Sequence, residues 1–248
     1  MGAIEKAGGV WEPNVMSLMK KVIKANAACL DIGANIGVYT LLISELAPQG
    51  RIHAFEPSAM NFWFLEQNIT DNRLSNVVAH RLALGNKTGM GNFHYLPNFR
   101  RMLFRRRSNR RRRPGPNYRK RLGGAGRQGH RAGPSTLDGS VTEAFIHRLD
   151  FAKMDVEGSE RFVLEGGGTT FERFRPTLFT ELNTMCLAKY FGLTPDSYFT
   201  LLRQYYGFIY ALLPNTGDII PLNRYNDLST LLTPQRWWAD LVCAPRPL

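Results

Sequence analysis

Residues 30–37 read Leu30-Asp31-Ile32-Gly33-Ala34-Asn35-Ile36-Gly37, and this stretch decides how the chain folds. A short apolar run, residues 27–32, leads into the two glycines, and the mostly apolar residues 38–43 follow them. The pattern predicts a strand, a glycine turn and a helix. At such a turn, the missing side chains let a ligand approach the backbone closely.

Outward from this turn, strand patterns recur at intervals that leave room for helices. Strands are expected at residues 50–55, 77–84, 151–156, 176–181, 207–212 and 240–244, and helices at 13–24, 58–69, 159–165 and 195–205. Strands that alternate with helices favour a doubly wound, mostly parallel sheet. The loop between the last two strands is too short for a packed crossover helix, so an antiparallel hairpin is expected at one edge. We expect one α/β domain over residues 1–248.

Length and composition are those of an ordinary globular protein. The chain has 248 residues, 44% of them apolar, and its apolar runs are far shorter than the roughly 20 residues of a membrane span. Cys29, Cys186 and Cys243 form no C-x-x-C pair and are expected to be small buried thiols rather than zinc ligands. The N-terminus has no basic head followed by an apolar stretch, so no secretory signal is predicted and a cytoplasmic location is expected.

The formal net charge of +12 is concentrated in one segment. Between Arg100 and Arg131 there are 14 Lys or Arg and no acid, which leaves 18 bases and 20 acids on the rest of the chain. Residues 99–135 contain 22 Arg, Gly or Pro among 37 residues and no apolar periodicity, which predicts a disordered insertion. It is a basic arm, a solvated loop or a stretch translated in the wrong frame. Nucleic acid is disfavoured as a partner because no aromatic residues alternate with the charges.

The acid that ends the second strand indicates the kind of ligand. Glu56 lies 19 residues after Gly37 and is followed by a proline that ends the strand. A carboxylate at this place can accept both hydroxyl hydrogens of a ribose. The glycine turn and this acid together predict a cofactor that contains a nucleoside.

The charge of Asp31 distinguishes between two such cofactors. The glycines are spaced G-x-x-x-G rather than G-x-G-x-x-G, and a carboxylate at the mouth of the turn would repel the phosphates of NAD. S-adenosylmethionine has no phosphate, and its ammonium and sulfonium would be attracted. Asp31 therefore favours S-adenosylmethionine, unless its role is to cap the following helix.

The chain resembles the FkbM-type family of S-adenosylmethionine-dependent methyltransferases. The resemblance covers roughly residues 11 to 98 and 136 to 245 and lapses between 99 and 135. The segments that carry it are Leu30–Thr40, Ala54–Pro57, Ala83–Gly85, Thr136–Asp138, Lys153–Glu160 and Pro176–Glu181.

This resemblance implies a seven-stranded, Rossmann-like class I methyltransferase sheet and methyl transfer to a hydroxyl of a small-molecule or glycosidic acceptor. It places Asp31, Gly33 and Gly37 around the methionine end of the cofactor, Glu56 on the ribose, and Ala83 and Leu84 beside the adenine. The complete set of expected cofactor-binding residues is Asp31, Gly33, Ala34, Asn35, Gly37, Glu56, Pro57, Ala83 and Leu84.

A second acidic group provides candidate catalytic residues. Asp155 and Glu157 lie at the end of the fourth strand, and they point to the same face if the strand persists. Glu181 ends the next strand and is expected beside them at the carboxyl edge of the sheet. One of these three carboxylates is the expected base that removes the acceptor proton. They could instead hold Mg²⁺, or orient the cofactor and bond to backbone amides.

Other residues leave further alternatives open. His94 and His147 are expected near the crevice, where either could be the base, whereas His53 and His80 are expected to pack within strands. Lys153 is expected to point to the face opposite Asp155 and to form a structural ion pair. An NAD-dependent oxidoreductase and a nucleic-acid-binding protein that uses the arginine tract remain the alternative functions.

Overall fold

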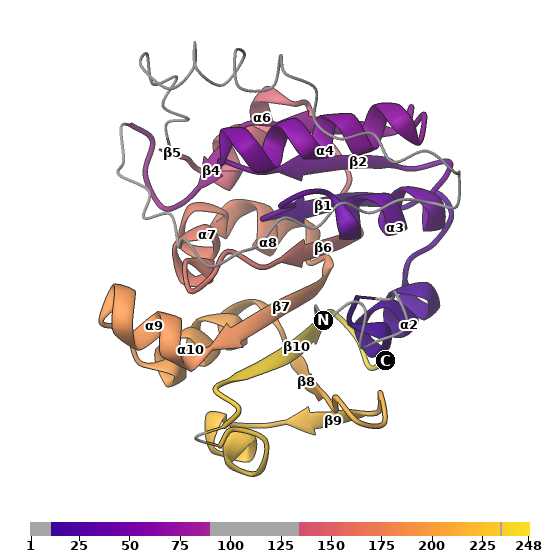
Figure 1. The fold of residues 1–248 in the computed structure, drawn as a ribbon. Coiled ribbons are helices and arrows are strands. Elements are labelled where there is room, and N and C mark those ends of the chain that lie inside the picture. Colours follow the sequence, from indigo (N-terminus) through magenta and orange to yellow (C-terminus); the bar gives the residue numbers. More distant parts are fainter. Residues whose placement is uncertain (1–10, 90–133, 234) are drawn as a thin grey trace.

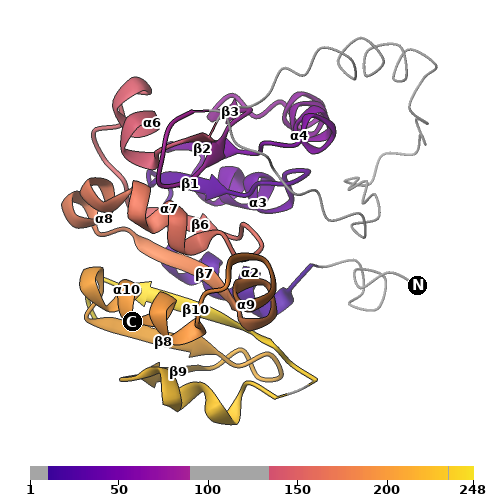
Figure 2. The same cartoon turned by 90° about the vertical axis from the view of Figure 1, so that its left-hand side faces the viewer.

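The computed structural model describes residues 11–89, 134–233 and 235–248. In these residues one eight-stranded sheet crosses the molecule with helices on both of its faces (Figures 1 and 2). The expected α/β, doubly wound architecture is confirmed. Most of the segment expected to be a disordered insertion, residues 99–135, lies outside the described residues.

Five strands of the sheet pair in parallel, as predicted, and the other three join the sheet through antiparallel pairs. The parallel strands are β1 Ala28–Ile32, β2 Arg51–Phe55, β3 Val77–His80, β6 Phe151–Met154 and β7 Thr177–Asn183. The others are β8 Phe208–Leu212, β9 Ile219–Leu222 and β10 Trp238–Ala244. The order across the sheet is β3-β2-β1-β6-β7-β10-β8-β9. Because β10 pairs antiparallel with both β7 and β8, the antiparallel edge is confirmed.

The expected count of seven strands is wrong. The additional strand, β9, contains Pro221, which lowers its strand propensity. Proline is tolerated there because β9 is the edge strand of the sheet. The expected strand at 77–84 is divided: β3 belongs to the main sheet, whereas β4 Ala83–Leu84 pairs with β5 Pro134–Ser135 in a separate two-stranded sheet.

The helices divide between the two faces of the sheet. The predicted ones are α2 Pro13–Val22, α3 Val38–Leu46, α4 Ala59–Asp71, α7 Glu160–Gly166 and α10 Pro195–Tyr205. The sequence patterns missed α6 Leu137–Glu143, α8 Gly168–Phe174, α9 Thr184–Phe191 and the 3₁₀ helix η1 Tyr225–Thr230. Each of these four has eight residues or fewer, too few to show a clear helical period.

Two hydrophobic clusters cover opposite faces of the sheet. Leu30 and Ile32 of β1 face the cluster that includes residues of α7, α8 and α10, whereas Cys29 faces the cluster that includes α2 and α3. The alternation of a strand accounts for this division. The three cysteines are buried free thiols, as predicted. No helix in the described part of the chain is long and apolar enough to span a membrane.

The glycine turn joins the carboxyl ends of three strands. The amides of Gly33 and Ala34 both donate to the Phe55 carbonyl at the end of β2, at 3.0 and 2.9 Å. Gly33 has a φ of 83°, and a Cβ added to it would lie 1.9 Å from the carbonyl oxygen of Asp155, just beyond β6. Only glycine fits this place, because both the φ and the close approach exclude a side chain.

We predict that Gly33→Ala destabilises the protein strongly. The left-handed φ costs about 1–2 kcal/mol in a residue with a Cβ, and the clash with the Asp155 carbonyl adds about 1–3 kcal/mol of overpacking. Gly192→Ala is the matched control, because Gly192 has a φ of 62° but no atom of the described residues within 4 Å of an added Cβ. Urea unfolding measures both variants. Equal losses of unfolding free energy would show that the close approach at Gly33 has no energetic effect.

Candidate functional site

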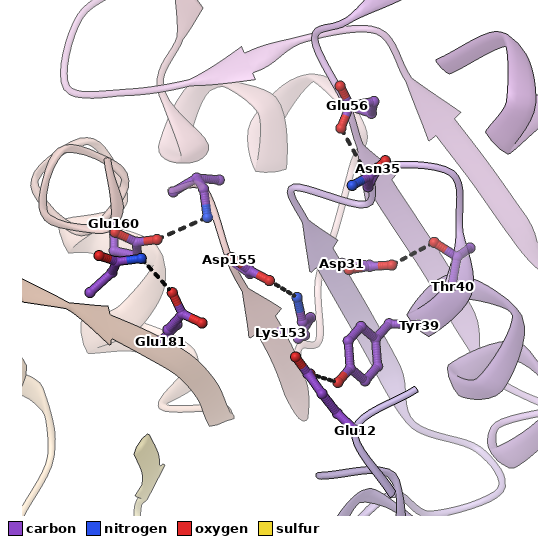
Figure 3. Close-up of polar contacts among 12 residues, drawn as sticks. Glu12, Asp31, Asn35, Tyr39, Thr40, Glu56, Lys153, Asp155, Glu160 and Glu181 are labelled. Carbon is purple, nitrogen blue, oxygen red and sulfur yellow. Dashed lines mark hydrogen bonds and ion pairs between the residues drawn. The ribbon is translucent and has the colours of Figure 1, made fainter. Parts of the chain in front are cut away.

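Acidic side chains gather where β1, β2, β6 and β7 end (Figure 3). Asp240 lies near the start of β10. The carboxyl ends of parallel strands open onto the ligand crevice of such folds. Side chains two residues apart in a strand point to the same face. Asp31 therefore shares a face with Cys29, and Lys153 and Asp155 share a face with Phe151. Cys29 and Phe151 belong to the hydrophobic cluster of α2 and α3. The charged residues therefore lie on the sheet face that α2 and α3 cover.

Glu56 anchors the glycine turn to the end of β2. Its carboxylate accepts hydrogen bonds from the amides of Asn35, at 2.9 Å, and Ser58, at 2.8 Å, one on each oxygen. Burial outweighs these bonds and raises the pKa of Glu56 to about 7. Each oxygen of an ionised carboxylate retains a further acceptor site, so Glu56 can also accept from ligand hydroxyls.

The backbone of the turn offers few free donors. The amides of Gly33, Ala34, Asn35 and Gly37 are all bonded within the protein, to the Phe55 carbonyl, the Glu56 carboxylate or the Ala34 carbonyl. A phosphate would need such amides free, and it would also meet the nearby carboxylates. This geometry disfavours the alternative of a dinucleotide bound at the turn.

Asp31 does not lie at the mouth of the turn, and that expectation is wrong. The residue is fully buried, and its Oδ2 accepts a 2.5 Å hydrogen bond from Thr40 in the first turn of α3. Its Oδ1 receives no hydrogen bond from the described residues. Burial raises its pKa, although the charge of Lys153 acts in the opposite direction. The bond to Thr40 agrees with the alternative that Asp31 supports the N-terminus of α3.

Lys153 forms the expected ion pair, but not on the expected face. Its Nζ lies 2.9 Å from Asp155 Oδ2, since residues two apart in a strand share a face. The same ammonium lies 4.5 Å from the ring centroid of Tyr39. Burial alone would lower the pKa of Lys153, but the charges of Asp155, Asp31 and Glu12 raise it above its ordinary value. Lys153 is therefore a buried ammonium.

Tyr39 connects this ion pair to the entry of α2. Its hydroxyl donates to Glu12, which precedes α2 with a left-handed φ of 41° (Figure 3). Burial and the charge of Glu12 raise the pKa of the Tyr39 hydroxyl, so it stays a donor. Burial also raises the pKa of Glu12, partly offset by Lys153.

A cavity opens at this place, and acids dominate its wall. Its ionisable residues are Glu12, Tyr39, Lys153, Asp155, Glu181 and Asp240. Asp155 and Glu181 were expected here. Glu12 and Asp240 were not among the expected site residues, although an acid within an apolar strand, as at Asp240, was an available signal.

Glu181 and Asp240 face each other across the sheet. They are directly paired in the antiparallel register of β7 and β10, so their side chains share a face. Burial, with a contribution from Asp155, raises the pKa of Glu181 to about 9. Burial, with the charges of Glu12 and Asp155, raises the pKa of Asp240 to about 7.

Glu157 lies beside the cavity rather than on its wall. The expected continuation of the strand is wrong, because β6 ends at Met154 and Glu157 has a φ of 55°. Burial and Asp155 raise the pKa of Glu157 to about 7. Glu160 is buried and closes the same loop, since its Oε1 accepts from the Val156 amide at 2.9 Å.

The remaining expected cofactor residues lie around the turn and in the core. Ala34 is buried and packs with Ala54 and Leu65, whereas Pro57 is half-buried after the end of β2. Ala83 and Leu84 are both buried, in the strand that pairs with β5. Their expected place beside adenine stays a prediction.

The histidines divide into three groups. His147 is exposed and precedes β6, where the Asp150 amide bonds to Ala28 at the amino end of β1. This is the edge opposite the crevice, so the expectation for His147 is wrong. His53 and His80 stack within the sheet, with ring centroids 5.2 Å apart, as predicted. His94 lies outside the described residues.

No three His, Cys, Asp or Glu side chains in the described part of the chain are grouped as a metal site. Asp155, which the Mg²⁺ alternative requires as a ligand, already bonds to the Lys153 ammonium. The geometry therefore does not favour that alternative.

Comparisons with known proteins show which family the chain resembles. A family model described as the methyltransferase FkbM domain matches residues 31–218. Methyltransferase sdnD of Sordaria araneosa is 31% identical over 160 residues, which cover 58% of this chain and 61% of that protein. Methyltransferase 1 of Beauveria bassiana is 39% identical over 56 residues, 23% of this chain and 22% of that protein. The match thus spans less than two thirds of either relative.

A solved structure shows the same fold. The methyltransferase FkbM of Methylobacillus flagellatus KT superposes with a TM-score of 0.51 at 18% identity, over 89% of this chain and 44% of that chain. The family model covers most of the chain, including the glycine turn, Glu56, Asp155 and Glu181. The chain therefore belongs to the methyltransferase FkbM domain family, whose methyl donor is S-adenosylmethionine.

Proposed function

We propose that this protein transfers a methyl group from S-adenosylmethionine to a hydroxyl of a small-molecule or glycosidic acceptor. One observation carries the proposal: a glycine turn with its amides engaged lies beside a cavity walled by carboxylates. This arrangement suits a cationic nucleoside and not a phosphate. The hydroxyl acceptor rests on the family resemblance.

The residues present fit the methyl donor. Glu56 is held by two backbone amides with acceptor capacity left for ribose hydroxyls. Oδ1 of buried Asp31, two residues before Gly33, receives no hydrogen bond from the described residues. Gly33 and Gly37 keep the turn free of side chains. When bound, S-adenosylmethionine supplies an electrophilic methyl group on a positively charged sulfur.

The chain's own contribution to the reaction is alignment and proton removal. Asp155 lies at the end of β6 with one oxygen fixed by Lys153, and its side chain is 33% exposed. Burial raises the pKa of Glu181 to about 9. We assign proton removal to Asp155, because Lys153 fixes its Oδ2 while the side chain stays partly exposed to a substrate. Fixing Asp155 in this way holds the acceptor oxygen in line for displacement.

We predict that Glu56→Ala weakens binding of S-adenosylhomocysteine. The variant removes two charge-assisted hydrogen bonds and the anchor of Asn35, which together cost about 2–3 kcal/mol, or roughly 30- to 150-fold in Kd. Isothermal titration calorimetry measures the change. Glu66→Ala, which alters an exposed residue of α4, serves as the control. An unchanged Kd for Glu56→Ala would refute the ribose assignment.

Binding should also depend on pH through the same residue. The pKa of Glu56 is raised to about 7, so lowering the pH from about 8 to 6 protonates the carboxyl and removes an acceptor. The affinity for S-adenosylhomocysteine then falls by at most about tenfold per pH unit. Glu56→Gln cannot titrate and should show a flatter profile. Identical profiles for the two proteins would assign the pH dependence to other groups.

We expect Asp155→Asn to abolish most of the turnover while leaving cofactor binding largely intact. Loss of a general base costs about 10²- to 10⁴-fold in rate. Transfer of a radiolabelled methyl group is the measurement, with S-adenosylhomocysteine binding as a check on the fold. Asp71→Asn, an exposed change at the end of α4, is the control. Normal turnover in Asp155→Asn would exclude its role as base.

A further inference from the structure

The acidic cavity is lined by residues other than those of the glycine turn and Glu56. The glycine turn and Glu56 follow β1 and β2, whereas Glu181 and Asp240 lie on β7 and β10. In the sheet, β7 is two strands and β10 three strands away from β1. At the usual strand spacing these distances are roughly 10 and 14 Å. This end of the cavity is therefore on the acceptor side.

Three of the four carboxylates on the cavity wall have a hydrogen-bond donor or an ion-pair partner in the described part of the chain, and one has neither. Asp155 bonds to Lys153, Glu12 accepts from Tyr39, and Glu181 accepts a 3.0 Å hydrogen bond from the Asn183 side chain. Asp240 receives neither a hydrogen bond nor an ion pair from the described residues. Among the described residues, one carboxylate on the acceptor side thus remains without a donor.

The cavity itself shows which chemistry suits such a carboxylate. Lys153 places an ammonium 2.9 Å from Asp155 and 4.5 Å from the Tyr39 ring centroid, so carboxylate and aromatic ring together bind a cation. Lys153 is the single Lys or Arg among the described residues that line the cavity. The charges of Arg236 and Lys153 act on Asp240, but no ion pair to Glu181 or Asp240 is formed within the described part of the chain. The two carboxyls are neighbours in the register of β7 and β10.

We propose that the acceptor carries an ammonium group, which Glu181 and Asp240 bind so that its hydroxyl lies near Asp155. The inference rests on the proposed function and specifies the acceptor's chemical class. Glu12 and Asp240 lie outside residues 31–218, the span that the family model matches. Of the two carboxyls that would bind the ammonium, Glu181 thus belongs to the matched span and Asp240 does not.

Three small alcohols of different charge test this proposal. The probes are 2-aminoethanol, ethylene glycol and glycolate, which carry charges of +1, 0 and −1 at neutral pH. Their binding is measured by saturation-transfer NMR, with and without saturating S-adenosylhomocysteine. We expect 2-aminoethanol to bind at least fivefold more tightly than ethylene glycol, in both conditions, and glycolate to bind more weakly than either.

Two variants locate the preference, and thermal unfolding confirms that each is folded. Asp240→Asn should reduce the preference for 2-aminoethanol at least threefold, and Glu181→Gln should do the same. Asp218→Asn, a change in the loop before β9 and away from the cavity wall, should leave it unchanged. A preference that survives both cavity variants would overturn the proposal, as would equal binding of the three probes by the wild type.

The measurements with S-adenosylhomocysteine distinguish a failure of this inference from a failure of the proposed function. If the preference for 2-aminoethanol disappears once S-adenosylhomocysteine is bound, the carboxylates serve the cofactor's own ammonium and the inference is wrong. If S-adenosylhomocysteine fails to bind to the wild type, the proposed function itself is wrong, and the inference fails with it.

Discussion

The close approach of three strand ends at Gly33 sets the geometry on which the rest of the site depends. The amides of Gly33 and Ala34 share the Phe55 carbonyl, and the backbone of Asp155 lies so close to Gly33 that no side chain fits between them. The ends of β1, β2 and β6 are thereby held together. Glu56 and Asp155 lie directly after two of these ends, so their separation is fixed by backbone packing and hydrogen bonds.

The electrostatics of the site follow from where the carboxylates are buried. Glu56, Glu181 and Asp240 all have a raised pKa, and burial is the largest cause for each. Lys153 compensates part of this charge, because its ammonium bonds to Asp155 and also acts on Asp31 and Glu12. The raised pKa of these carboxyls thus reflects a burial cost that Lys153 offsets only in part.

Much of the fold and some of the site could be predicted from the sequence. The order of strands and helices indicated the doubly wound sheet, and Glu56 follows the end of β2 as expected. Edge strand β9 was not predicted, because Pro221 interrupts its run of residues with high strand propensity. The side-chain face of Lys153 was predicted incorrectly, although the two-residue period of a strand places it with Asp155. Asp31 was expected at the mouth of the turn, whereas β1 buries it under α3.

The sequence by itself determined the class of fold, the position of the glycine turn and the acids that end the strands, because these follow from local patterns of a few residues. Only the tertiary structure decided which charges share a cavity. Glu12 and Asp240 are 228 positions apart, and neither lies in a recognisable motif. They line one cavity because β10 inserts between β7 and β8 while the entry of α2 covers the same face, and such an arrangement depends on the packing of the whole sheet.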